Sequence, residues 1–238
     1  MFGFDFGWLG DPLYQSWFLK GLATTLLLSA IAGILSILLG IAGAAILHFK
    51  TPLLAPFTVV LVDLFRNTPP LVQLFFFYFM LSDVGLSFTD PVTGATLPVF
   101  GGFTCVVLSL CTFNGAIAIE VIRSGISAVP SQTVEGARSL GYTRRQVFLT
   151  MELPLALRMT VPPMTNNIVS IIKTSAQASL VAVTDITYYA TQVMLETFLN
   201  IEVMMALWLI YVAIATIVSL GARFISRAVR IPGYGLST

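Results

Sequence analysis

A row of polar side chains lies inside an apolar stretch in the second half of the chain. Its members are separated by four, three and four residues, with Thr174 beside them: Asn166, Ser170, Lys173 and Gln177. In an α-helix this spacing puts the side chains on one face. A lysine inside a membrane helix is costly and should face protein or water. The row predicts a polar path for a solute. A buried structural Lys173, paired with Glu120 or Asp63, is the other interpretation.

No residue pattern in the chain fits catalysis or metal binding. Cys105 and Cys111 are six residues apart in an apolar run and match neither a metal nor a redox spacing. None of the three lysines follows a Gly-x-x-x-x-Gly pattern of the kind that cradles ATP phosphates. We therefore expect no enzymatic activity, no cofactor and no metal site in this chain.

Composition indicates a membrane protein. Apolar residues make up 57% of the chain, charged residues 10%, and the mean hydropathy is +0.92, whereas a soluble domain carries about 25% charge. The 12 basic and 11 acidic residues do not favour nucleic acid as a partner. Five stretches reach the roughly 20 residues that a bilayer requires: 21–47, 53–81, 99–121, 155–183 and 203–222. The expected fold class is an all-α polytopic membrane protein with five transmembrane helices.

Two of these five stretches contain paired prolines. In the second, Pro69 and Pro70 remove helical hydrogen bonds, which polar neighbours can restore. In the fourth, Pro162-Pro163 disturbs the first turns. Arg66, just before the first proline pair, is expected to be a structural anchor near the cytoplasmic face rather than a ligand for the solute.

The longest water-compatible stretch, residues 129–158, lies between the third and fourth spans. Ser131 is expected to cap a short helix, and Gly141 follows that helix where a left-handed C-terminal cap is needed. The helix has an apolar side that recurs every three residues: Val134, Ala137 and Leu140.

A second short helix follows within the same stretch. Thr143 and Gln146 have the spacing of a capping box, and Pro154 is expected to end the helix. Four charged residues are expected on the water-facing side of the two short helices: Glu135, Arg138, Arg144 and Arg145. The sequence thus predicts a helix–turn–helix projection that fits a cleft of another protein.

This projection resembles the EAA loop of ABC importer permeases. The resemblance is carried by Glu135-Gly136-Ala137, by Gly141 six residues after Glu135, and by Leu153-Pro154. In that family the loop forms the coupling helix that docks on the cytoplasmic ATPase. The resemblance implies coupling roles for Glu135, Gly136, Ala137, Arg138, Gly141 and Arg144. Gly136 replaces the usual Ala, which lowers helix propensity by about 1 kcal/mol.

Other stretches resemble the polar amino acid branch of these permeases, which have a MetI-like transmembrane domain. Residues 65–73 resemble Phe-Arg-Gly-Thr-Pro-x-x-x-Gln, with Asn67 for the common Gly, and residues 120–126 resemble Glu-x-x-Arg-x-Gly-Ile. Their polar residues are interpreted as structural anchors: Arg66, Gln73, Glu120 and Arg123. The last two, three residues apart on a helix, are expected to neutralise each other.

The family also usually carries a lysine at the position of Lys173, followed by Asp-Thr-Ser-Leu. Here Thr174-Ser175-Ala176-Gln177 follows. Losing the aspartate and gaining Gln177 changes the local charge, which bears on which substrate fits.

Loop charges predict the orientation. The basic residues fall on one side of a five-span arrangement: Lys50, Arg123, Arg138, Arg144, Arg145, Arg158, Arg223, Arg227 and Arg230. Loops 82–98 and 184–200, on the other side, contain neither Lys nor Arg. The positive-inside rule puts the projection and the C-terminus in the cytoplasm and the N-terminus outside.

The resemblance covers residues 21–222 and implies a permease subunit of a binding-protein-dependent importer of polar amino acids in a bacterial inner membrane. The expected parts are an interfacial segment (1–19), a transmembrane domain (20–226) containing the coupling loop (129–158), and a cytoplasmic tail (227–238). The expected partners are a second permease subunit, identical or homologous, two ATPase subunits that bind ATP and Mg, an extracytoplasmic solute-binding protein, and lipid. ATP would drive alternating access.

Two other functions fit a membrane protein of this kind. One is an ion-coupled secondary transporter with Lys173 and Glu120 as a relay, which predicts transport on a proton or sodium gradient without ATP. Five spans without an internal repeat argue against it. The other is a scaffold without transport, which leaves the polar row unexplained.

Overall fold

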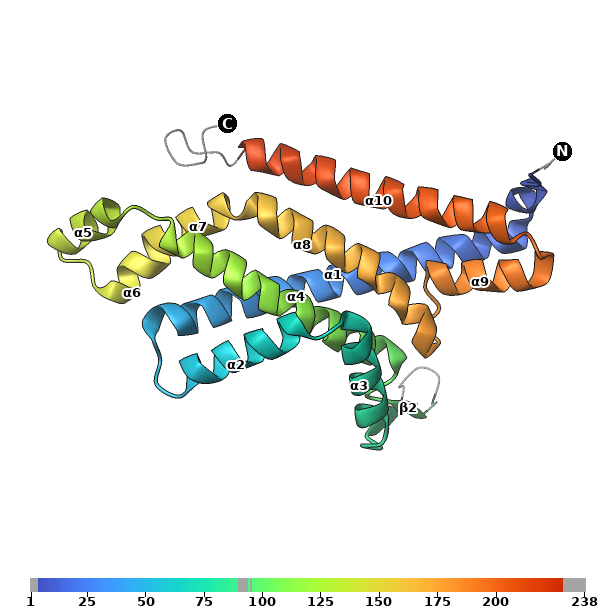
Figure 1. Cartoon of the computed structure of the whole chain (residues 1–238), viewed down its shortest axis with the longest axis horizontal. Helices are drawn as coiled ribbons and strands as arrows, with labels where there is room; N and C mark the ends of the chain where they lie inside the picture. The colour runs from blue at the N-terminus through green and yellow to red at the C-terminus, as the bar shows by residue number, and fades with distance from the viewer. Residues whose placement is uncertain (1–3, 90–93, 95, 229–238) are drawn as a thin grey trace.

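The computed structural model describes residues 4–89, 94 and 96–228, and these are almost entirely helical (Figure 1). The helices are η1 (Gly7–Gly10), α1 (Pro12–Phe49), α2 (Leu54–Asn67), α3 (Pro70–Ser82), α4 (Gly102–Ser127), α5 (Ser131–Ser139), α6 (Arg144–Val147), the π-helix η2 (Phe148–Glu152), α7 (Leu153–Met159), α8 (Val161–Thr174), η3 (Ser175–Val181), α9 (Ile186–Thr197) and α10 (Asn200–Ala228). Strands β1 (Ser87–Thr89) and β2 (Thr96–Pro98) form an antiparallel hairpin.

The long helices lie roughly along one axis, as Figure 1 shows. Helix α1 runs through most of the length of the molecule, and α4, α8 and α10 lie along it. Helices α5 and α6 project at one end, and α9 lies at the opposite end, near the N-terminus. Helix α3 turns away from this axis next to the hairpin. The projection and the loop helix α9 therefore lie at opposite ends of the helical body.

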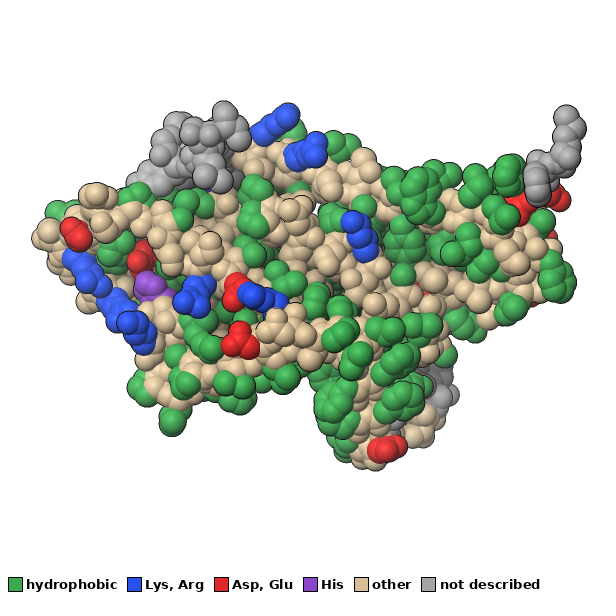
Figure 2. Space-filling model, in the orientation of Figure 1, with side chains coloured by type: hydrophobic (Ala, Val, Ile, Leu, Met, Phe, Trp, Pro, Cys, Tyr) green, Lys and Arg blue, Asp and Glu red, His purple; other side chains and the backbone are tan. Residues whose placement is uncertain are grey.

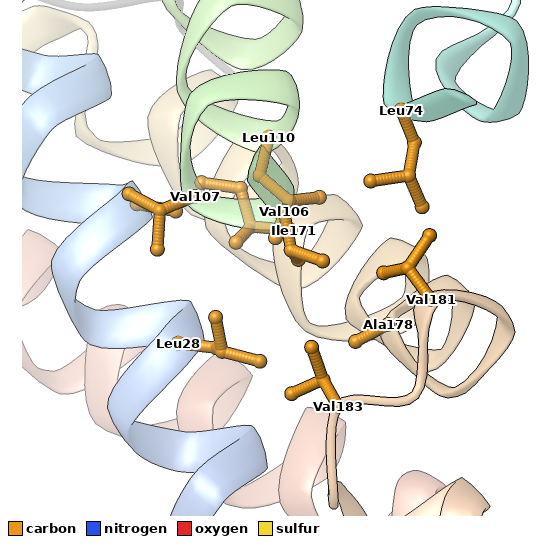
Figure 3. Close-up of a cluster of buried hydrophobic side chains, with 10 residues drawn as sticks. Leu28, Leu74, Val106, Val107, Leu110, Ile171, Ala178, Val181 and Val183 are labelled. Carbon is orange, nitrogen blue, oxygen red and sulfur yellow. The ribbon is translucent and has the colours of Figure 1, made fainter. Parts of the chain in front are cut away.

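The interior is an apolar cluster at the crossing of α1, α3, α4, α8 and η3 (Figure 3). It includes Leu28, Leu74, Leu110 and Ile171. Helices α1 and α4 approach closely because glycines face the contact: a methyl group added at Gly43 would lie 2.5 Å from Cδ1 of Ile119. Small residues at helix contacts let backbones approach in this way.

Within residues 4–89, 94 and 96–228, three helices are long and apolar enough, by length and composition, to cross a membrane: α1, α4 and α10. The second and fourth predicted spans are divided into shorter helices, α2 and α3 in one case and α7, α8 and η3 in the other. Prolines 69–70 and 162–163 lie at these divisions, as the sequence predicts.

The ends of the predicted spans differ from the helix bounds. Helix α1 begins at Pro12 because the Asp11 carboxylate accepts a hydrogen bond from Leu13 N (2.8 Å), so residues 12–19 of the predicted interfacial segment belong to the first helix. Trp8 is buried in a cluster with residues of α9 and α10. Helix α10 continues to Ala228, and the rest of the predicted tail lies outside the described residues.

Candidate functional site

The break between α2 and α3 is repaired by one side chain. Pro69 has no N–H to offer the carbonyl of Phe65, four residues earlier. The amide nitrogen of Gln73 takes this position: it lies 2.6 Å from Phe65 O and 2.6 Å from Thr68 Oγ1. Gln73 is buried at 5% exposure. The predicted anchor Gln73 thus closes the gap in the helical hydrogen bonds.

Replacing Gln73 with Leu should lower the stability of the purified protein. The substitution keeps the volume but leaves the part-buried Phe65 carbonyl without its side-chain donor, which costs roughly 1–3 kcal/mol. Thermal unfolding in detergent, followed by size-exclusion chromatography, measures this. Gln132→Leu, at an exposed glutamine of α5, is the matched control and should change the midpoint little. Equal midpoints for the two variants would contradict the assigned role of Gln73.

The predicted pairing of Glu120 with Arg123 is wrong. Glu120 on α4 forms its ion pair with Arg66 on α2, and Arg123 is exposed, with no ion pair among the described residues. Glu120 pairs with Arg66 because α2 packs along α4. The spacing of residues within one helix does not reveal this long-range contact. The ion pair joins the two helices on the N-terminal side of the Pro69 break.

The turn between α5 and α6 has the geometry that its residues predict. Gly141 has φ +86°, Gly141 N donates to Arg138 O (2.9 Å), and Tyr142 N donates to Ala137 O (3.3 Å), which together form a Schellman motif. Thr143 and Gln146 form the predicted capping box. The predicted cap at Ser131 is wrong: Ser131 is the first helical residue, and Pro130, with extended backbone, takes the cap position without a side-chain bond.

The surface of this projection is only partly the predicted one. Glu135, Gly136, Arg138 and Gly141 are exposed, while Ala137 is buried at 3% exposure. Leu140, predicted to lie on the inward apolar side, is 78% exposed. Leu140 is exposed because it is the C-terminal cap of α5, next to the left-handed turn, and therefore does not belong to the regular apolar face of the helix.

Leu140 and its neighbour Tyr142, 43% exposed, add apolar surface beside the charged residues. Exposed apolar side chains on a projection indicate a contact with a partner. Sequence reasoning missed both as surface residues, although their position on either side of the turn glycine was a usable signal.

The projection is fixed to the body by polar and aromatic contacts with the end of α1. Arg144 Nη2 donates to His48 O (2.8 Å), and the guanidinium lies 5.5 Å from the Phe49 ring centroid. His48 Nε2 lies 3.4 Å from Glu152 Oε2, and Phe49 packs against Phe148 with ring centroids 4.9 Å apart. Figure 2 shows basic side chains gathered at this end of the molecule, around the histidine. Arg144, predicted to contact a partner, therefore also joins α6 to α1.

Pro154 does not end the second helix, contrary to the prediction. The backbone stays helical from α6 through the π-helix η2 into α7, where Pro154 is the second residue. A π-turn just before a proline absorbs the missing hydrogen bond and the steric conflict of the ring. The chain breaks instead at Thr160 (φ −91°, ψ 0°), between α7 and α8. There the Thr160 methyl group lies over Gly125 of α4.

The polar row on α8 and η3 is not covered by the rest of the chain. Asn166 and Lys173 are exposed, and Ser170, Thr174 and Gln177 are half-buried. Lys173 forms no ion pair with any residue of the described ranges. The proposed pairing of Lys173 with Glu120 is therefore not observed, because Arg66 occupies that carboxylate. The row is polar, cationic and open along one side of the chain.

The side of α8 that lies opposite the polar row packs against α4 and fixes the position of the helix. Asn167, buried at 4% exposure, donates its amide to Asn114 O on α4 (2.9 Å), and Ile171 and Ser175 continue this side at 0% exposure. Sequence reasoning missed Asn167, although it begins a repeat of four residues with Ile171 and Ser175. This contact fixes which face of α8 is left open.

A helical body with helices long and apolar enough to cross a membrane, an open polar row and a helical projection fits a component of a membrane transport system. Residues 36–231 match the family described as "Binding-protein-dependent transport system inner membrane component", and the chain belongs to this family. It is thus a multi-pass inner-membrane permease subunit.

Individual proteins agree with this assignment. The chain is 29% identical over 229 residues to the glutamate/aspartate import permease protein GltJ of Escherichia coli strain K12, covering 94% of this chain and 92% of the relative. It is 30% identical over 212 residues to the probable glutamine ABC transporter permease protein GlnM of Bacillus subtilis strain 168, covering 89% and 93%.

Solved structures share the fold. One, described as an amino acid ABC transporter with histidines, matches with a TM-score of 0.80 and 26% identity over 96% of this chain and 99% of the other. Inward-facing MetNI methionine transporter structures share the fold at 17% identity, with a TM-score of 0.77 over 93% and 100% of the two chains.

Proposed function

We propose that this permease subunit imports polar amino acids by alternating access, powered by separate ATPase subunits. Two permease subunits and two ATPase subunits would form the assembly, with a solute-binding protein delivering substrate from outside. The chain would cross the membrane five times, with the N-terminus outside and the C-terminus in the cytoplasm. The names of the relatives GltJ and GlnM support an amino acid as substrate, and loop charges support the orientation.

The observation that carries the proposal is the mechanical link from α5 to α8. The exposed residues Glu135, Gly136, Arg138 and Leu140 would fit a cleft of the ATPase. Arg144 and His48 tie the projection to the end of α1, and the backbone is helical from α6 through α7. A displacement of α5 would therefore reach α1 and α7, and through the junction at Thr160 it would also reach α8.

The open polar row would line the substrate path against the second permease subunit. Asn166, Ser170, Lys173 and Gln177 offer hydrogen bonds and one positive charge, a combination that suits the carboxylate and polar groups of an amino acid. The contact of Glu120 with Arg66 disfavours the alternative, a proton or sodium relay between Lys173 and Glu120.

Reconstitution tests the proposal directly. The permease, co-expressed with the ATPase and binding protein encoded beside it, is placed in proteoliposomes and supplied with a panel of labelled amino acids. We expect uptake that requires both ATP and the binding protein. Uptake driven by a proton or sodium gradient without ATP would refute the proposal and favour the secondary transporter.

Lys173→Ala should reduce uptake of the carried amino acid roughly tenfold or more, since a charge-assisted hydrogen bond is worth about 1.5–3 kcal/mol. The same panel should also reveal changed selectivity. Lys20→Ala, at an exposed lysine of α1, is the control and should transport normally. If Lys173→Ala only lowers the yield or melting temperature of the protein and leaves selectivity unchanged, Lys173 has a structural role.

A further inference from the structure

A pocket of about 340 Å³ opens between the first turns of α8 and the last turns of α10. Its lining residues are Pro162, Thr165, Asn166, Ser219, Ala222, Arg223, Ser226 and Arg227. The five that belong to α10 recur at intervals of three and four residues, so one face of that helix provides them. None of its lining residues belongs to the projection formed by α5 and α6.

The lining is cationic and rich in hydrogen-bond donors. Arg223 and Arg227 are both exposed, and neither forms an ion pair within the part of the chain that the structure describes. None of the described lining residues is acidic. Guanidinium groups pair with phosphate oxygens through two parallel hydrogen bonds. The pocket therefore has the chemistry of a phosphate site, with the hydroxyls of Ser219 and Ser226 beside it.

The surroundings indicate where the phosphate comes from. Leu220, Phe224 and Ile225, at the same end of α10, are 56%, 75% and 56% exposed, and α10 is one of the three helices that can cross a membrane. Arg223 and Arg227 thus lie at the same end of α10 as exposed apolar side chains that are compatible with lipid. A free phosphate ion would use only the arginines, whereas a phospholipid offers its phosphate to the pocket and its acyl chains to the apolar surface. Basic pockets between helices at the cytoplasmic interface suit anionic headgroups.

We propose that this pocket binds the headgroup of an anionic phospholipid. Arg223 and Arg227 hold the phosphate, and Ser219 and Ser226 form hydrogen bonds with the hydroxyl groups of a glycerol headgroup. The assignment to the cytoplasmic leaflet rests on the proposed orientation of the chain, while the binding itself is independent of the transported solute. Uptake and lipid binding can thus fail separately, which keeps the two proposals distinguishable.

Native mass spectrometry of the purified full chain, with any subunits that co-purify, tests the site. Phosphatidylglycerol and phosphatidylcholine are added in turn, and the bound lipid is counted. We expect the protein to prefer phosphatidylglycerol and the double variant Arg223→Gln/Arg227→Gln to lose that preference roughly tenfold, as expected for lost charge-assisted contacts. Arg158→Gln, at an exposed arginine of α7, is the control and should keep it. An unchanged preference in the double variant overturns the proposal.

A second variant separates a seated headgroup from general attraction to positive charge. Ala222→Phe fills the pocket and keeps both arginines, so it should also lose the preference. Retained preference in this variant would mean that surface charge alone attracts the lipid, which rules out the pocket. Competition with inorganic phosphate is the last measurement. If millimolar phosphate displaces the bound lipid completely and binds as tightly as the lipid does, the pocket is a site for free anions and the lipid assignment is wrong.

Discussion

Glu135→Lys should abolish ATP-dependent uptake while the protein still inserts into the membrane. Glu135 is exposed on α5, and a methyl group added at its neighbour Gly136 would meet no atom within 4 Å, so this surface is free for a partner. Reversing a charge at a complementary interface leaves two like charges facing each other and weakens binding roughly tenfold or more. The measurement is co-purification of the ATPase subunit, followed by uptake in proteoliposomes.

Glu196→Lys is the matched control for this charge reversal. Glu196 is exposed on α9, at the opposite end of the molecule from α5 (Figure 1). The control should retain the ATPase. If Glu135→Lys retains the ATPase and transports normally, the projection is not the coupling element and the proposed mechanism is wrong.

Gly21→Ala should lower the stability of the protein. The added methyl group would lie 2.7 Å from Ile186 Cα and 2.8 Å from Asp185 O, both of them backbone atoms that cannot rotate away. The start of α9 is also fixed in place, because Ile186 N donates to Thr25 Oγ1 (3.1 Å) and Tyr188 N donates to the Asp185 carboxylate (2.8 Å). Separating α1 from α9 should cost about 1–3 kcal/mol, read as a lower thermal midpoint in detergent.

Gly221→Ala provides the control within α10. A methyl group there would meet no atom within 4 Å, and replacing glycine with alanine in a helix stabilises it by up to about 1 kcal/mol. The two variants make the same chemical change and should move the midpoint in opposite directions. A midpoint for Gly21→Ala at or above that of the unmodified protein would contradict the close contact of α1 with α9.

Features that depend on neighbouring residues could be predicted from the sequence. The left-handed Gly141, the capping box of Thr143 and Gln146, and the break at Pro69 all follow from local backbone chemistry, and all are present. The row from Asn166 to Gln177 could be placed on one face, although its last residue, Gln177, belongs to the 3-10 helix η3, which has three residues per turn rather than 3.6.

Features that depend on packing between helices could not be predicted. Arg66 forms the ion pair with Glu120 because α2 lies against α4, whereas spacing along the helix alone predicted Arg123 as the partner. Tyr211 in α10 hydrogen-bonds with Thr187 of α9 (2.9 Å), a contact that no local pattern contains. Pro154 lies within a continuous helix because a π-turn precedes it, and the sequence carries no reliable signal for a π-turn.

The glycine under Thr160 has a mechanical consequence. Thr160 and Ala156 lie against Gly125 of α4, which has no side chain to separate them from α4. About two helical turns after Thr160, Asn167 joins α8 to α4 through Asn114. Because the junction at Thr160 packs closely on Gly125 and α8 is held at Asn167, a displacement of α7 would reach α8 as a tilt about these two contacts. We expect α7 and α8 to tilt about these contacts during transport, and a larger side chain at position 125 to hold the two helices in one arrangement.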